Sequence, residues 1–172
     1  MRRLHVALIS SLLALFAWLQ CGQPLLAAPR TQAPAANPQD VSTVDAIIQA
    51  LYQVISGPAA QKRDWDRFRT LFAPGARLIP ALVRKGEKPL IRVLDVEEYI
   101  RRTDAFFEKE DFWESEKERR MDSSGNLVHA FSMYESRHRE GDQPFQTGVN
   151  SIQLFSDGTR WWIVTVMWNS TR

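Results

Sequence analysis

The stretch SDGTRWWIVTVMWNS, residues 156–170, contains three of the chain's six tryptophans. A β-strand points successive side chains to opposite faces. One face of this segment would carry Trp161, Ile163, Thr165 and Met167, and the other Trp162, Val164, Val166 and Trp168. Neither face is polar, so the pattern predicts a strand covered on both sides.

The preceding sequence predicts helices first and strands afterwards. Helices are expected from about 44 to 55, where Ser42 and Asp45 resemble a capping box, over 64–72, and over 96–109 after the cap Asp95. A short hairpin is expected from 77–84 and 89–94. Four further strands are expected at 112–122, 127–138, 145–156 and 160–169. This order predicts an α+β fold with a mainly antiparallel sheet.

Turn lengths suggest how the last four strands pair, although bulges are frequent in curved sheets. Glu114 would lie opposite Glu135, Asn150 opposite Met133 and Thr165, and Ile152 opposite Ile163. One face would then be apolar at one end and polar at the other, as a ligand pocket requires. This pocket face comprises Glu114, Glu116, His129, Phe131, Met133, Glu135, Arg137, Asn150, Ile152, Trp161, Ile163 and Thr165.

The opposite face carries aromatic and small side chains, a composition that favours a subunit interface. The expected interface residues are Tyr134, Val149, Ser151, Trp162, Val164, Val166 and Trp168; Val128, Ala130 and Ser132 share their face. Plain core packing is the other explanation for the tryptophans. The pattern predicts a homodimer formed through this face.

Three strings in these strands resemble the nuclear transport factor 2-like superfamily, in its bacterial SnoaL-like branch with a cystatin-like fold. They are YESRH (134–138), GVNSIQLF (148–155) and DGTRWWIV (157–164), and the resemblance covers 42–169. It implies a strongly curved sheet wrapped as a cone around N-terminal helices, commonly with a pocket and a sheet-mediated dimer. The superfamily includes isomerases, dehydratases, cyclases and non-catalytic binding domains, so the fold alone selects no function.

The N-terminus has the pattern of a Sec-type signal peptide. Arg2 and Arg3 precede an apolar segment (6–19), and small residues follow at Ala27 and Ala28. As a helix, the apolar segment would span about 21 Å, less than the roughly 30 Å hydrocarbon core of a bilayer. We expect cleavage after Ala27 and a periplasmic or secreted protein. A membrane anchor and a lipoprotein modified at Cys21 are the alternatives.

Removal of residues 1–27 changes the composition. The segment contains two of the 22 basic residues and no acidic residue, so 20 basic and 20 acidic residues remain. This balance argues against nucleic acid as a partner. The only cysteine is also removed, which excludes disulfides and thiolate chemistry. Residues 28–40 predict a flexible Pro/Ala-rich linker, and 41–172 a single domain.

Few residues of the predicted pocket suggest chemistry. Glu114 and Glu135 together could form a general acid and base, whereas a slip in the pairing would give an ion pair between Glu114 and Arg137. Asn150 could bind a ligand carbonyl or stabilise a bend. His129 and His138, nine residues apart on one strand, cannot share a metal or a catalytic dyad. The His–Asp pair of the superfamily's dehydratases has no counterpart here.

The sequence therefore favours an exported, non-catalytic domain that binds a small, partly apolar molecule, or an accessory domain. No metal or other cofactor is expected. The alternative is a cofactor-free lyase or isomerase, such as a dehydratase, a cyclase or a ketosteroid-isomerase-like enzyme. It would use Glu116 or Glu135 as the base, and Asn150 or Arg137 to hold an oxyanion.

Overall fold

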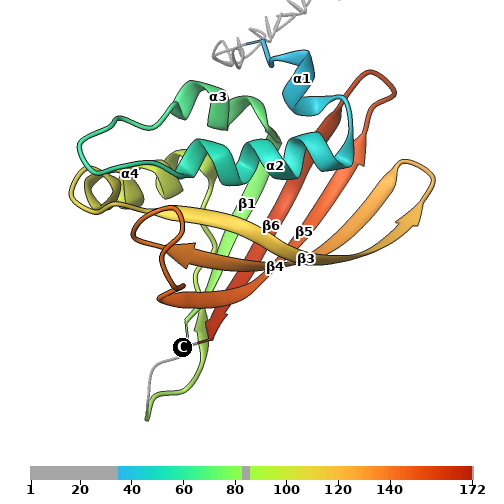
Figure 1. Cartoon of the computed structure of the whole chain (residues 1–172). Helices are drawn as coiled ribbons and strands as arrows, with labels where there is room; N and C mark the ends of the chain where they lie inside the picture. The colour runs from blue at the N-terminus through green and yellow to red at the C-terminus, as the bar shows by residue number, and fades with distance from the viewer. Residues whose placement is uncertain (1–34, 83–85, 172) are drawn as a thin grey trace, which may run out of the picture. The chain divides into compact units, whose positions relative to one another are not determined.

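A computed structural model describes residues 35–82 and 86–171 (Figure 1). The expected signal peptide and cleavage site, and residues 28–34 of the expected linker, lie outside this part of the chain. The helices are α1 (Pro38–Val41), α2 (Val44–Ile55), α3 (Trp65–Thr70) and α4 (Val96–Phe107). The strands are β1 (Phe72–Leu82), β2 (Leu90–Ile91), β3 (Trp113–Ser124), β4 (Leu127–Arg137), β5 (Gln146–Ser156) and β6 (Trp161–Thr171). The α+β prediction is confirmed.

The strands form one six-stranded sheet in the order β2-β1-β6-β5-β4-β3. All neighbours are antiparallel except β1 and β6, which are parallel. The sheet curves beneath α2, and α2, α3 and α4 lie along one side of it (Figure 1). We call the sheet face that packs against these helices the inner face and the opposite one the outer face.

Residues 38–41 depart from the expected linker because they form a helix that packs on the domain. Asn37 caps α1, and Asp40, which is buried, forms an ion pair with Arg67 at 2.8 Å. The folded domain therefore begins before residue 41. The cap of α2 also differs from the prediction, because Thr43, and not Ser42, accepts a hydrogen bond from the Ala46 amide.

Helix α2 has an aliphatic face that packs on the sheet, as its 3.6-residue period predicts. Ile47 and Ile48 are fully buried, and Tyr52 places the only hydroxyl on this buried face. In α4, Asp95 caps the helix as predicted, and Phe107, rather than Phe106, is the buried aromatic residue.

The core beneath α3 is aromatic and aliphatic. Phe68 is fully buried and contacts the rings of Phe72 and Tyr99, with ring centroids 4.7 and 5.4 Å apart. The Ile163 amide donates to the Leu71 carbonyl at 2.9 Å, which ties β6 to the end of α3. This contact fixes the position of the start of β6, the tryptophan-rich last strand.

A bulge in β6 overturns the simple alternation expected for that strand. Leu154 pairs with Ile163 and Gln153 with Thr165, so Val164 is an extra residue. Side chains before and after the bulge therefore share a face, and both Ile163 and Val166 are buried on the inner side.

The string DGTRWW spans the turn before β6 and the first two residues of that strand. Asp157 accepts from the Thr159 hydroxyl, from Trp162 Nε1 and from the Thr159 and Arg160 amides at 2.6–2.9 Å, and these hydrogen bonds hold its pKa well below the usual range. The Arg160 guanidinium lies 3.6 Å from the centroid of the Trp162 ring and donates to the Thr70 carbonyl. These contacts give the string a structural role.

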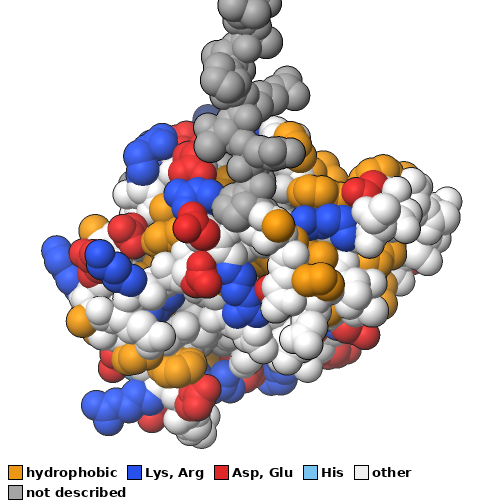
Figure 2. All heavy atoms as spheres, turned by 90° about the horizontal axis from the view of Figure 1, so that it is seen from above, with side chains coloured by type: hydrophobic (Ala, Val, Ile, Leu, Met, Phe, Trp, Pro, Cys, Tyr) orange, Lys and Arg blue, Asp and Glu red, His pale blue; other side chains and the backbone are white. Residues whose placement is uncertain are grey.

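Charged side chains of both signs lie next to one another on the surface above the helices (Figure 2). Several are paired, including Arg67 with Asp40, Arg69 with Asp66 and Glu97, and Arg102 with Glu98. Over the described residues, this surface is therefore mixed in charge and offers no continuous basic patch.

Candidate functional site

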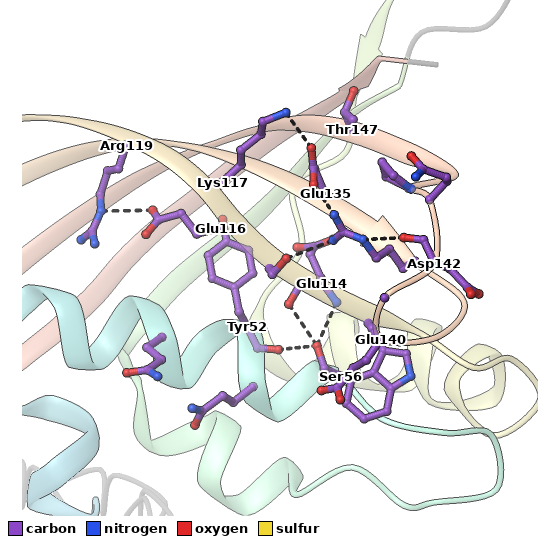
Figure 3. Close-up of a pocket in the computed structure, with 18 of the residues that line it drawn as sticks. Tyr52, Ser56, Glu114, Glu116, Lys117, Arg119, Glu135, Glu140, Asp142 and Thr147 are labelled. Carbon is purple, nitrogen blue, oxygen red and sulfur yellow. Dashed lines mark hydrogen bonds and ion pairs between the residues drawn. The ribbon is translucent and has the colours of Figure 1, made fainter.

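A cleft of about 1290 Å³ lies beside the edge strand β3. Its walls come from α2, β3, the end of β4, the segment 140–144 and the start of β5 (Figure 3). Side chains from both faces of β3 line it, because β3 has no neighbouring strand on this side. The inner wall is formed by α2 and the inner face of β3, and the outer wall by side chains of the outer face.

A directed hydrogen-bond chain lies on the inner wall. Asn150 Nδ2 donates to Tyr52 Oη at 3.0 Å, and Ser132 Oγ donates to Glu116 Oε1 at 2.5 Å. Tyr52 Oη and Ser132 Oγ are 2.7 Å apart, and the Ser132 proton is already used, so the Tyr52 hydroxyl donates to Ser132. Arg119 closes the chain with an ion pair to Glu116 at 3.1 Å.

Glu114 is the second carboxyl of the inner wall and differs from Glu116. It accepts hydrogen bonds from Ser136 Oγ, at 2.9 Å, and from the Asn150 side chain. No Lys or Arg of the described residues forms an ion pair with it. Burial raises the pKa of Glu114 to about 7, and the hydrogen bonds from Ser136 and Asn150 offset only part of this effect.

The backbone of Glu114 is held against α2. Its amide donates to Ser56 Oγ at 2.9 Å, while Ser56 Oγ in turn lies 2.7 Å from the Tyr52 carbonyl (Figure 3). The carboxyl is thus positioned by one helix and two strands.

Three buried or half-buried tyrosines lie within the electrostatic range of this carboxyl. Burial raises the pKa of Tyr52, Tyr99 and Tyr134 above the usual range, and the negative charge of Glu114 adds to the effect in each case. All three hydroxyls therefore remain protonated at neutral pH. They can donate hydrogen bonds but carry no charge.

The outer wall is a network of paired charges. Lys117 Nζ lies 2.8 Å from Glu135, and Arg137 also pairs with Glu135 and donates to the Asp142 carbonyl at 2.9 Å (Figure 3). The hydrogen bonds from Lys117 and Arg137 lower the pKa of Glu135. Glu135 is therefore an ionised partner in an ion-pair network.

The strand pairings expected from turn lengths were wrong, and each error moved residues between faces. Glu114 lies opposite Ser136, not Glu135, and Ser132, not Met133, lies opposite Asn150. In the last pair of strands, Asn150 lies opposite Trp168, not Thr165, and Ile152 opposite Val166, not Ile163. A shift of one residue exchanges the two faces of a strand. Neither the Glu114–Glu135 pair nor the Glu114–Arg137 pair is formed.

The predicted pocket residues consequently divide between the two faces. The register places Glu114, Glu116, Asn150, Ile152, Trp161 and Ile163 on the inner face, and His129, Phe131, Met133, Glu135, Arg137 and Thr165 on the outer face. Of the twelve, Glu114, Glu116, Glu135 and Arg137 line the cleft.

The predicted interface residues divide in the same way. Val149, Ser151, Trp162 and Val164 are on the outer face or at its bulge. Tyr134 and Val166 are buried on the inner face, where Trp168 also packs against the core. Val128, Ala130 and Ser132, expected on the interface side, are buried there too. These inner residues are covered by helices of the same chain.

Sequence reasoning missed Tyr52 and Ser136 and placed Ser132 on the wrong side. The signal available for Tyr52 was a single hydroxyl on the otherwise aliphatic face of α2. No comparable signal marked Ser132 or Ser136, because their face depends on the register of β4.

The two histidines of the domain lie away from this inner wall. His129 bonds Ser151 at 2.9 Å and borders a smaller hollow of about 430 Å³ on the outer face, and His138 stacks on Phe145. Within residues 35–82 and 86–171, no three His, Cys, Asp or Glu side chains are grouped to hold a metal ion.

The sequence matches no protein-family model and no curated protein. Solved structures with a similar fold do exist. One is a protein of unknown function with a cystatin-like fold from Nostoc punctiforme, at 12% identity and TM-score 0.57, covering 74% of this chain and 88% of that one. A second is an NTF2-like protein of unknown function from Pseudomonas putida, at 11% identity and TM-score 0.57, covering 78% and 89%.

A third is a ketosteroid isomerase candidate from Parabacteroides distasonis, at 11% identity and TM-score 0.50, covering 82% and 98%. At these identities the similarity concerns the fold. The chain has the cystatin-like fold of NTF2-like proteins, as the sequence strings predicted.

Proposed function

We propose that the protein is a small-ligand-binding domain whose site is the cleft between α2 and β3. The observation that carries the proposal is the Glu114 carboxyl on the inner wall, positioned by Ser56, Ser136 and Asn150 beside a large cleft. Ligand sites typically combine a concave surface with a few convergent polar groups. A partly buried carboxylate without a cationic partner lowers the stability of the fold. A role in ligand binding explains why such a group is present.

Obstruction of the cleft tests this proposal. Gln49 is an exposed cleft residue on α2, so Gln49→Trp should fill the space without disturbing the core. Gln39→Trp, at an exposed position of α1 outside the cleft, is the matched control. Native mass spectrometry of protein isolated from its host should show a bound small molecule in the wild type and the control, and its loss in Gln49→Trp. Equal retention by all three proteins would place the ligand elsewhere.

We infer export from the N-terminal sequence. Among the described residues, no helix is both long and apolar enough to span a bilayer. N-terminal sequencing of the exported fraction should begin at Ala28. Protein that begins at a lipid-modified Cys21, or that retains Met1 in the membrane fraction, would contradict this inference.

We also propose that the protein forms a homodimer through the outer sheet face. The support is an apolar outer surface that includes Met133, Val149, Val164 and Met167, of which the last two are exposed. Met167→Glu should convert a dimer to a monomer in sedimentation at micromolar concentration, because it places a charge at the centre of an apolar contact. A wild-type protein that sediments as a monomer would contradict the proposal.

A cofactor-free lyase or isomerase is the second candidate function. What favours it is the pKa of Glu114, about 7, because a carboxyl near the working pH can both accept and donate a proton. Glu114 thus replaces Glu116 and Glu135 as the base to test. Turnover of a bound substrate should rise as pH increases through 7 and should be abolished by Glu114→Gln. Candidate substrates that bind and remain unchanged would exclude catalysis on them.

A further inference from the structure

We propose that the ligand of the cleft is an organic cation, an amine with an apolar portion, whose protonated nitrogen pairs with the carboxylate of Glu114. This inference rests on the proposed function and adds to it the chemical class of the ligand.

The charges that line the cleft favour a cation. Its described lining contains six acidic side chains, Asp45, Glu114, Glu116, Glu135, Glu140 and Asp142, and three basic ones, Lys117, Arg119 and Arg137. Opposite charges in a concave site raise the local concentration of a ligand, and like charges lower it. An anionic ligand would therefore meet a net negative cleft.

The three basic side chains already have carboxylate partners. Arg119 pairs with Asp45 at 2.9 Å and with Glu116 at 3.1 Å, and Lys117 and Arg137 both pair with Glu135. An anion could bind them only by displacing these partners. In contrast, Glu114 forms no ion pair with a described residue.

The described side chains around Glu114 do not include a positively charged one. Ser136 of β4 and Asn150 of β5 donate hydrogen bonds to it, and Tyr52 of α2, Tyr99 of α4 and Tyr134 of β4 are close enough for its charge to raise their pKa values. All five are uncharged at neutral pH. The nearest charged side chain on the inner face of the same strand is Glu116, which is also acidic and forms an ion pair with Arg119. A ligand ammonium group would supply the charge that these elements lack.

The remaining lining accommodates an apolar portion. Two aromatic residues, Trp113 and Tyr52, are among the residues that line the cleft with Glu114. Aromatic faces attract cations and bury hydrocarbon. An arylalkyl amine combines the two features.

The proposal predicts how binding depends on pH. A cation pairs with the ionised carboxylate, so below the pKa of Glu114, about 7, binding must release a proton. The affinity should therefore be about tenfold higher at pH 8 than at pH 6, if the charge of the ligand is constant over this range. A ligand that accepts a hydrogen bond from the protonated carboxyl would show the opposite trend.

The test uses three probes that share a phenethyl group and differ in the polar group attached to it: phenethylamine as the cation, 2-phenylethanol as the neutral analogue and 3-phenylpropionate as the anion. Binding is measured by NMR titration at pH 6 and pH 8. We expect phenethylamine to bind at least tenfold more tightly than the other two at pH 8, and to weaken about tenfold at pH 6. Glu114→Gln should abolish both the preference and the pH dependence.

Glu140→Gln is the matched control, because Glu140 is an exposed carboxylate of the same cleft and its replacement leaves the pairs of Lys117 and Arg137 with Glu135 intact. It should retain the preference for the cation. Equal binding of the alcohol, preference for the anion, or a cation preference that survives Glu114→Gln would overturn the inference. If the host-derived ligand is lost in Gln49→Trp yet proves neutral or anionic, the proposed function stands and this inference fails.

Discussion

The two ends of the inner sheet face are buried by different means. Near α3, Phe68, Ile152 and Ile163 are fully buried members of the apolar core. Near α2, Ser132 and Tyr52 are also buried but are connected by hydrogen bonds that lead to Asn150 and to the two carboxyls of β3. The comparison teaches that one sheet face can combine an apolar core, whose contacts have no preferred direction, with a directional polar network, and the polar end borders the cleft.

Truncation at the apolar end should have the largest effect on stability. Phe68→Ala removes a fully buried ring that contacts Phe72 and Tyr99, and should lower the free energy of unfolding by about 3–5 kcal/mol. Urea denaturation measures the change. Phe106→Ala, at an exposed position of α4, is the control and should cost far less. A small loss in Phe68→Ala would mean that the apolar end is loosely packed.

At the polar end, stability should depend on pH through Glu114. Its pKa is raised in the folded state, so between the ordinary carboxyl pKa of 4.5 and about 7 the folded protein binds more protons than the unfolded chain. The free energy of unfolding therefore falls as pH rises through this window, by about 3 kcal/mol from this group.

Urea denaturation at pH 5 and pH 8 should reveal this contribution as the difference between the wild type and Glu114→Gln. From pH 5 to pH 8, the free energy of unfolding of the glutamine variant should rise by about that amount relative to the wild type, because the variant has no charge to bury. Parallel pH profiles for the two proteins would show that the Glu114 carboxyl is well solvated.

Loss of one hydroxyl within the polar chain should have a smaller effect. Tyr52→Phe removes the acceptor of one Asn150 N–H, while the bond from Asn150 to Glu114 remains, and it leaves Ser132 without a donor; it should cost about 1–2 kcal/mol of unfolding free energy. A double-mutant cycle with Ser132→Ala tests the connection, because the two costs should not add if the hydroxyls act as a unit. Strict additivity would argue against a connected chain.

The smallest effect is expected on the outer wall. Glu135→Gln removes a carboxylate whose partners, Lys117 and Arg137, remain accessible to water, and the free energy of unfolding should not change measurably at physiological salt. The same denaturation experiment checks this. A large loss would show that the outer wall contributes to the fold as strongly as the inner wall does.

Much of the fold was predictable because it depends on local patterns. The period of α2, the Asp95 cap of α4 and the turn at Asp157 follow from residues close together in the sequence. The grouping of residues around Glu114 could not be predicted in this way, because it depends on strand register. The register places Glu135 and Arg137 on the outer face, and Ser132 and Ser136 on the inner face with Glu114.

The sequence alone determined where most of the helices and strands lie, the α+β class and the similarity to NTF2-like folds. Periodicity and turn residues act over a few positions and require no knowledge of distant partners. Only the tertiary structure decided which face of each strand meets the helices. Val164 adds one residue to β6, and β4 pairs with β5 one residue away from the expected register. Because side chains alternate with a period of two, these small shifts moved Tyr134, Ser132 and Val166 inward and Glu135 outward, and left Glu114 as the carboxyl of the inner wall without a cationic partner.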